Sequence, residues 1–212
     1  MIKAIILDID GVLLESTKII VKTHQKLAKK LGLRVPRPRE FSKLWGRPLE
    51  EIVKIIWPDV DLNKYVKNYR KTLIEGGIKI PPIKNAKNTV EKLKNSGFKL
   101  SLVTGRNHKL TSLHMKEAGF DLNSFDVIVT CEETKNHKPD PEPILYAYKL
   151  LKVEPEDVIY VGDSLLDYQS AKKSGVEFFA VLTGDIDKKE FRENGIKNII
   201  SSISELPKFL KL

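Results

Sequence analysis

Short apolar runs separated by amphipathic segments make up most of the chain. The first run, residues 2–9, is apolar except for Lys3 and Asp8. Continuous apolar runs of this length are typical of strands that are buried on both faces of a parallel sheet. Further runs of the same kind cover residues 98–103, 126–130, 158–161 and 178–182.

Segments with a helical spacing of apolar residues lie between the later runs. A glycine follows three of these segments closely, at the place where helices commonly end in a left-handed residue. Strands that alternate with helices in this way predict an α/β fold with a doubly wound parallel sheet. The predicted helices cover residues 86–95, 110–118, 141–151 and 165–174.

The alternation is interrupted once, because residues 15–81 carry only helical patterns. Three amphipathic helices are expected there, of which the second begins near Pro48 and the third ends before Gly76. A helical segment of this size between two strands predicts a small inserted cap domain. We expect residues 15–81 to form this cap, and residues 1–14 and 82–212 to form the core.

Polar residues follow four of the predicted strands at their carboxyl ends, where open α/β sheets bind ligands. Several carboxylates at one sheet edge repel one another and raise each other's pKa unless a cation balances them. Carboxylate and carbonyl oxygens suit Mg²⁺, so the pattern predicts a magnesium site. The polar residues at the strand ends are Asp8 and Asp10, Thr104 to Arg106, Lys138, and Asp163 with Asp167.

These residues carry a resemblance to a known family. The chain resembles the haloacid dehalogenase (HAD) superfamily, whose four motifs it matches in order over nearly its whole length. The matching residues are Asp8-Ile9-Asp10-Gly11-Val12-Leu13, Thr104, Lys138-Pro139-Asp140-Pro141 and Gly162-Asp163-Ser164-Leu165-Leu166-Asp167. It is most similar to the phosphatase branch with a helical cap after the first motif, as in phosphoglycolate phosphatases. The resemblance implies a Mg²⁺-dependent phosphatase with a Rossmann-like core, acting on a small phosphorylated metabolite.

The resemblance also implies a role for each acid of the first motif. Asp8 is expected to attack phosphorus and form an aspartyl-phosphate intermediate. Asp10 is expected to protonate the leaving oxygen and then to accept a proton from water, which requires a raised pKa. Mg²⁺ is expected to bind the carboxylates of Asp8 and Asp163 and the backbone carbonyl of Asp10.

Other motif residues have supporting roles by the same resemblance. Thr104 is expected to bind a phosphoryl oxygen, helped by backbone N–H groups near Gly105. Lys138 balances the charge of Asp8 and of the transferred group. Asp167 is expected to orient either the metal site or Lys138 without contacting the substrate itself.

Two arginines are candidates for binding the substrate. Arg106 directly follows the strand end that is expected to bind phosphate. Arg47 lies at a helix–helix junction of the predicted cap, from which it can reach a second anionic group. The cap type favours phosphoglycolate as substrate, and pyrophosphate, nucleoside monophosphates and sugar phosphates stay open.

Three other functions fit parts of the pattern. A mutase similar to β-phosphoglucomutase shares the motifs but returns the phosphoryl group to a sugar. Phosphonatase chemistry requires a cap lysine that forms a Schiff base. A receiver-type signalling module also uses strand-end acids, a threonine and a lysine, but such modules are shorter and lack a cap.

Composition argues against several classes of partner and location. The net charge is +9, but only seven of the 37 basic residues are arginine and the lysines are scattered among acids, which argues against nucleic-acid binding. The lone Cys131 fits a reducing interior, and the four histidines have no zinc-ligand spacing. No apolar run is long enough for a membrane span, and the acids near the amino terminus do not suit a signal peptide. We therefore expect a cytoplasmic monomer or homodimer.

Overall fold

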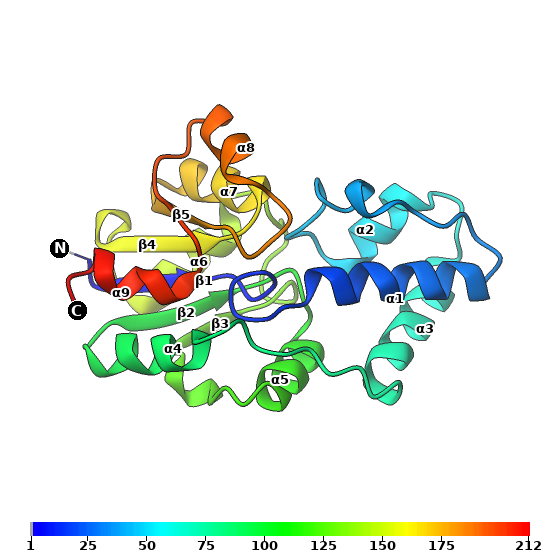
Figure 1. Ribbon diagram of the computed structural model, residues 1–212, viewed down its shortest axis with the longest axis horizontal. Helices are drawn as coiled ribbons and strands as arrows, with labels where there is room; N and C mark the ends of the chain where they lie inside the picture. The colour runs from blue at the N-terminus through cyan, green and yellow to red at the C-terminus, as the bar shows by residue number, and fades with distance from the viewer. Residues whose placement is uncertain (1) are drawn as a thin grey trace.

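A six-stranded parallel sheet forms the centre of the computed structural model, which describes residues 2–212 (Figure 1). The strand order is β3-β2-β1-β4-β5-β6, so the chain winds outward from β1 in both directions. Met1, counted with the predicted core, lies outside the described residues. The strands are β1 Ala4–Leu7, β2 Lys99–Val103, β3 Val127–Val129, β4 Val158–Gly162, β5 Glu177–Val181 and β6 Ile199–Ile200.

Helices cover both faces of this sheet. Alternate residues of β1 point to opposite faces: Ile5 and Leu7 pack with α4 and α9, whereas Ala4 and Ile6 pack with α6 and α7. The predicted doubly wound α/β fold is therefore confirmed. These helices are α4 Ala86–Asn95, α5 His108–Glu117, α6 Glu142–Leu151, α7 Leu165–Ser174, α8 Lys188–Glu193 and α9 Leu206–Phe209, with 3-10 turns at Leu122–Ser124, Pro155–Asp157 and Ile203–Glu205.

Three further helices lie between β1 and α4 in the chain and form a separate body beside the sheet (Figure 1). They bury their own apolar cluster, which includes Val53, Tyr65 and Tyr69. His24 lies inside this cluster, where burial lowers its pKa to about 3, so it is a neutral core residue. The elements of this body are α1 Thr17–Lys30, a 3-10 turn Pro38–Glu40, α2 Leu49–Ile56 and α3 Leu62–Glu75.

The two segments that join these helices to the sheet lie side by side. The Glu15 N–H donates to the Pro81 carbonyl at 2.9 Å, and the Ile83 N–H donates to the Leu13 carbonyl at 2.8 Å. The helical segment thus leaves the sheet and returns to it at one place. This arrangement suits an inserted cap, and its boundaries at residues 15 and 81 remain a prediction.

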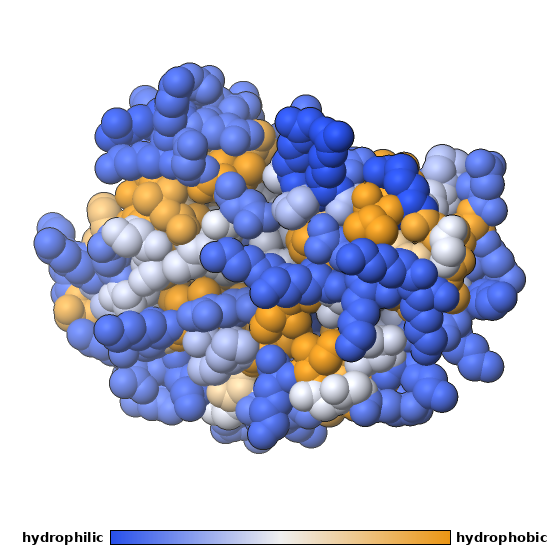
Figure 2. Space-filling model, turned by 45° about the vertical axis from the view of Figure 1, so that its right-hand side comes forward, coloured by the Kyte–Doolittle hydropathy of each residue, from blue (hydrophilic) through white to orange (hydrophobic). Residues whose placement is uncertain are grey.

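The face of the molecule that Figure 2 shows is mainly hydrophilic, and its hydrophilic side chains surround smaller apolar patches. None of the helices formed by residues 2–212 combines the length and the apolar character that a bilayer crossing requires.

Candidate active site

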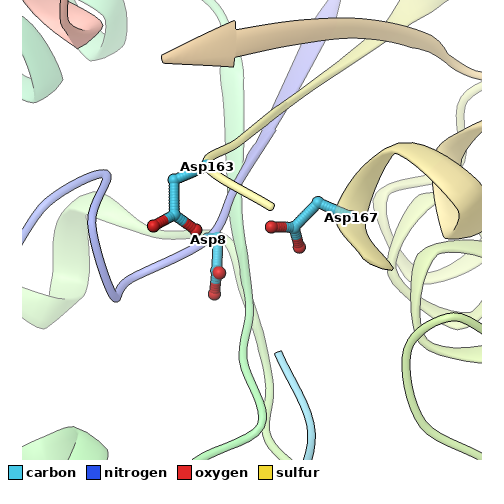
Figure 3. A group of neighbouring side chains, drawn as sticks. All are labelled: Asp8, Asp163 and Asp167. Atoms are coloured by element: carbon cyan, nitrogen blue, oxygen red, sulfur yellow. The ribbon is translucent and has the colours of Figure 1, made fainter. Parts of the chain in front are cut away.

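Three buried acids meet at the carboxyl ends of the two central strands. Asp8 follows β1 and Asp163 follows β4, and these strands pair in parallel register with Leu7 beside Val161. Asp167 lies in the first turn of α7. One oxygen from each carboxylate lies within 4.8 Å of the others, and Figure 3 shows the three side chains converging. Adjacent strand ends therefore place acids that are far apart in sequence around one small space.

Lys138 is the cation that faces this group. Its ammonium lies 3.1 Å from Asp8 Oδ1 and 2.8 Å from Asp167 Oδ1, and the residue is only 1% exposed. It also donates to the Tyr160 hydroxyl at 2.9 Å. The resemblance implied that Lys138 balances the charge of Asp8, and the structure brings these two side chains into contact. One ammonium cannot balance three carboxylates.

Asp167 is fully engaged by neighbouring donors. Ser164 caps α7 and donates its hydroxyl to Asp167 Oδ2 at 2.6 Å, while the Tyr160 hydroxyl and Lys138 donate to Oδ1. These contacts fix the carboxylate against Lys138. Of the two supporting roles expected for Asp167, this geometry favours orientation of Lys138. Tyr160 in the middle of β4 gave no signal in the sequence, because a tyrosine suits any buried strand.

Asp163 lacks such partners: its carboxylate accepts no hydrogen bond from residues 2–212, although the residue is only 2% exposed. Burial, with Asp167 and Asp8 nearby, raises the pKa of Asp163 well above its usual range. Burial, opposed by Lys138, raises the pKa of Asp8 to about 7. The ionised forms of these two acids thus need a further positive charge.

The surroundings of Asp163 fit a small cation. The backbone approaches its carboxylate from two sides, because a Cβ on Gly11 or Gly184 would lie 1.9 Å or 2.1 Å from Asp163 Oδ2. Only glycine allows this approach at these two positions. Two buried, undercompensated carboxylates in a close backbone cradle are a donor set suited to Mg²⁺.

Asp10 differs from its expected state. Arg106 binds its carboxylate with two hydrogen bonds, Nε to Oδ2 at 2.8 Å and Nη2 to Oδ1 at 2.5 Å, and the Ser16 hydroxyl donates to Oδ1. Burial alone would raise the pKa of Asp10, but Arg106 and Ser16 hold it below its usual value. The prediction of a raised pKa is therefore wrong for this arrangement, because a pair separated by 96 residues leaves no sequence pattern.

His114 supports Arg106 from behind. Its Nδ1 lies 2.5 Å from Arg106 Nη1, and burial together with the Arg106 charge lowers the pKa of His114 to about 4. The ring is therefore neutral near pH 7 and accepts a hydrogen bond from the guanidinium. Arg106 therefore has Asp10 and His114 as partners, and its side chain is 8% exposed.

The predicted phosphate-binding residues lie at the end of β2. Thr104 is buried, and its backbone N–H donates to the Val129 carbonyl at 3.0 Å. Gly105 meets the loop before α2 so closely that a Cβ would lie 2.7 Å from the carbonyl oxygens of both Gly46 and Arg47. The strand end and the helical body are thus in direct contact beside Asp8.

One cleft joins the sheet edge to the helices. Its cavity measures about 70 Å³. Arg47 lines it and pairs with Glu51 at 2.8 Å. Arg70 and Glu50, which the sequence did not single out, also line it and pair at 2.7 Å. Asp8, Asp10, Gly105 and Arg106 form the sheet side of the same cleft, and Trp45, Leu49, Ile52 and Tyr69 form apolar parts of its wall.

Comparisons with known proteins agree with this geometry. The family model for haloacid dehalogenase-like hydrolases matches residues 5–181. A phosphoglycolate phosphatase of Nitrosospira multiformis is 30% identical over 223 residues, which cover 99% of this chain and 96% of that protein. A putative pyrophosphatase PpaX of Caldanaerobacter subterraneus is 32% identical over 186 residues, covering 85% and 81%.

A solved structure has the same fold over its full length. The putative haloacid dehalogenase-like hydrolase from Bacteroides fragilis superimposes with a TM-score of 0.85 at 25% identity, covering 97% of this chain and 100% of that one. The sheet, the strand-end acids and the matched motifs all point to one family. The chain belongs to the haloacid dehalogenase-like hydrolases and is similar to phosphatases among them.

Proposed function

We propose that this protein is a Mg²⁺-dependent phosphatase that hydrolyses a small phosphomonoester through an aspartyl-phosphate on Asp8. The observation that carries the proposal is the pair of buried carboxylates, Asp8 and Asp163, at adjacent strand ends with raised pKa values and a single lysine beside them. The names of the similar proteins, phosphoglycolate phosphatase and pyrophosphatase, support phosphoryl chemistry.

In the first step the phosphoryl group is transferred from the substrate to Asp8. Asp8 Oδ1 accepts hydrogen bonds from the Ile9 N–H at 2.8 Å and is in contact with Lys138, whereas Oδ2 accepts none from the described residues. A carboxylate oxygen of Asp8 attacks phosphorus, the bond to the leaving oxygen breaks, and Asp10 gives that oxygen a proton. Thr104 and Lys138 bind the oxygens of the transferred group.

The second step releases phosphate. Water attacks the phosphorus of the aspartyl-phosphate, Asp10 takes the proton from the water, and orthophosphate leaves with Asp8 restored. Asp8, Asp163 and the Asp10 carbonyl would hold Mg²⁺, which when bound would supply positive charge to offset the charge on the phosphoryl oxygens. Lys138 keeps its contact with Asp8 through both steps, and Asp167 keeps Lys138 in place.

The cleft favours a leaving group that carries a second negative charge. Arg47 and Arg70 line it on the helical side and Arg106 on the sheet side. Asp10 is available as an acid only when Arg106 releases it, and an anionic group on the substrate competes for that guanidinium. Phosphoglycolate is our first choice on this ground, and pyrophosphate is the second.

We also propose that residues 15–81 act as the cap that covers this site, with Arg47 and Arg106 as its substrate contacts. Nucleoside monophosphates and sugar phosphates are the further candidate substrates to be tested. A mutase reaction shares the first step and differs only in the acceptor, so product analysis separates the two.

The decisive experiment compares Asp8→Asn with Asp59→Asn, a change at an exposed acid that does not line the cleft. Phosphate release from 2-phosphoglycolate, pyrophosphate and p-nitrophenyl phosphate is measured with Mg²⁺, with Ca²⁺ and with a chelator. We expect the Asp8 variant to lose at least about 10³-fold in kcat because the nucleophile is gone, and the Asp59 variant to keep wild-type rates. Turnover retained by the Asp8 variant would show that Asp8 is not the nucleophile. Full activity in the presence of chelator would refute the dependence on Mg²⁺.

A further inference from the structure

We propose that Trp45 and Asp185 are positioning residues that hold the loop 45–47 over the leaving-group side of the cleft. This inference rests on the proposed function, because it assigns the pair a task in that same site. The task is to set the distance between the helical body and the strand-end acids, so that a small leaving group is bound closely.

The pair forms a hydrogen bond between the two bodies of the molecule. Trp45 Nε1 donates to Asp185 Oδ2 at 2.9 Å, across 140 residues of sequence. Trp45 belongs to the helical body, since it packs in the α1–α3 apolar cluster and stacks on Phe41 with ring centroids 5.9 Å apart. Asp185 belongs to the sheet body, in the loop that follows β5. The bond therefore fixes one body against the other.

The loop that carries Trp45 touches the reacting groups directly. Gly46 lies on the side chain of Lys138, since a Cβ at Gly46 would be 3.6 Å from Lys138 Cδ and Cε. The carbonyl oxygens of Gly46 and Arg47 press against Gly105 at the end of β2. A shift of this loop would change the space beside Asp8, which lines the same cleft as Trp45.

The loop that carries Asp185 touches the proposed metal site. The Thr183 hydroxyl donates to the Gly11 carbonyl in the turn after β1. Gly184 lies against the Asp163 carboxylate. Three consecutive residues therefore contact the first motif, the acid of β4 and the tryptophan of the helical body. This continuity means that the position of Trp45 is set relative to the catalytic acids, not merely relative to the protein surface.

A second contact between the bodies makes the expected effect partial. His137, the residue directly before Lys138 in the chain, belongs to the sheet body. Its Nδ1 lies 2.9 Å from Oε1 of Glu51 on α2. This contact keeps the helical body attached when the Trp45 bond is lost. Asp185 is exposed, so water can replace the lost donor. The loop should therefore move slightly rather than detach.

The kinetic test uses the two tryptophans as a matched pair. Trp45→Phe keeps the aromatic ring and removes the N–H that reaches Asp185. Trp57→Phe removes an equivalent N–H, which donates to the Arg34 carbonyl at 2.8 Å within the helical body. We expect Trp45→Phe to lower kcat/KM for 2-phosphoglycolate by about tenfold, mainly through a higher KM, and Trp57→Phe to lower it little. Equal losses in the two variants would overturn the positioning role.

A second measurement needs no activity. In a Trp57→Phe background, Trp45 is the sole tryptophan, and its fluorescence is quenched with acrylamide. We expect Asp185→Ala to raise the quenching constant of Trp45, and Asp185→Asn, whose amide oxygen still accepts the N–H, to restore it. In a Trp45→Phe background, quenching of Trp57 should not respond to Asp185→Ala, which shows that the fold persists.

The two proposals fail in different ways. If Trp45 is quenched equally in the protein that keeps Asp185 and in the Asp185→Ala variant, the positioning pair is refuted, whatever the enzyme hydrolyses. Absence of phosphate release by the wild-type protein from every ester tested would refute the proposed function, while the quenching result still decides whether Asp185 holds Trp45.

Discussion

The two sides of the cleft hold their charges in different ways. On one side the strand-end cluster, which we define as Asp8, Lys138, Asp163 and Asp167, reaches the cleft through Asp8 and consists of side chains that are at most a few per cent exposed. On the other side lies the helical wall, which we define as Arg47, Glu50 and Arg70, which line the cleft, with Glu51, the partner of Arg47; these side chains are 28–38% exposed. Charges in the cluster depend on one another, because solvent does not screen them. Charges in the wall are partly exposed to solvent, which screens their contacts, so changing them should cost less than changing the cluster.

This difference separates chemistry from selection. A buried group of charges keeps its geometry only when every member is present, which suits nucleophilic attack and metal binding. A solvated wall tolerates substitution, so it can be adapted to different leaving groups without loss of the fold. Relatives named for phosphoglycolate and for pyrophosphate are compatible with such a division.

The largest effect is expected from Lys138→Met. Its ammonium contacts Asp8 and Asp167, and its loss leaves two buried carboxylates without their cation. We expect the free energy of unfolding to fall by about 3–5 kcal/mol, because removing one partner of a buried ion pair leaves the other charge buried and unpaired. Urea denaturation in the absence of Mg²⁺ measures this loss, and phosphate release should be abolished in the same variant.

A matched control and a second variant sharpen this test. Lys173→Met removes an exposed lysine whose ammonium donates to the Pro139 carbonyl at 3.0 Å, and its unfolding free energy should stay near the wild-type value. Lys138→Met combined with Asp167→Asn should recover part of the loss, because one of the unpaired charges is removed. If the single Lys138 variant is as stable as wild type, the strand-end cluster does not depend on its lysine.

An intermediate effect is expected from pH and Mg²⁺ together. The folded protein raises the pKa of Asp8 to about 7, whereas the unfolded chain has a value of about 3.9. Between these values the folded state binds more protons, so the unfolding free energy of the metal-free protein should fall as pH rises from about 4 to about 7. Mg²⁺ binds the ionised form, so it should raise the melting temperature more at about pH 8 than at about pH 5.

The control for this pH dependence is Asp8→Asn, which should make the fall over the same interval smaller and leave the part that Asp163, whose pKa is also raised, contributes. Asp10 acts with the opposite sign, because its pKa is lowered and its contribution is lost as pH falls toward that value. The two acids are therefore distinguished by scanning calorimetry at several pH values. An equal response to Mg²⁺ at low and high pH would contradict the assignment of Asp8 as a ligand.

Sequence patterns predicted the strand-end cluster better than the helical wall, for a physical reason. Buried strands have a strong apolar signal, and parallel strand ends meet at one edge, so Asp8 and Asp163 could be brought together without coordinates. The sixth strand was missed, because β6 has only two residues. Solvated helix positions carry no comparable signal, so Glu50 and Arg70 were not identified.

The pairing of Asp10 with Arg106 was missed for a related reason. Each residue was a site candidate by itself, but the hydrogen bonds depend on how the turn after β2 faces the turn after β1. A one-residue change in either turn would direct the side chains elsewhere. Proximity at a sheet edge is therefore predictable, whereas the partner of each side chain is not.

The smallest effect is expected from the Arg70–Glu50 pair of the helical wall. Both side chains are more than a third exposed, so their contact at 2.7 Å should contribute only about 0.2–1 kcal/mol. Single variants Glu50→Gln and Arg70→Met and their double variant, measured by urea denaturation, give the coupling energy directly. Because both residues line the cleft, the ratio of rates with 2-phosphoglycolate and pyrophosphate should change more than the stability does. A coupling energy as large as the loss expected for Lys138→Met, about 3–5 kcal/mol, would mean that the wall is as rigid as the strand-end cluster. Leaving-group selection and fold stability could then not vary independently.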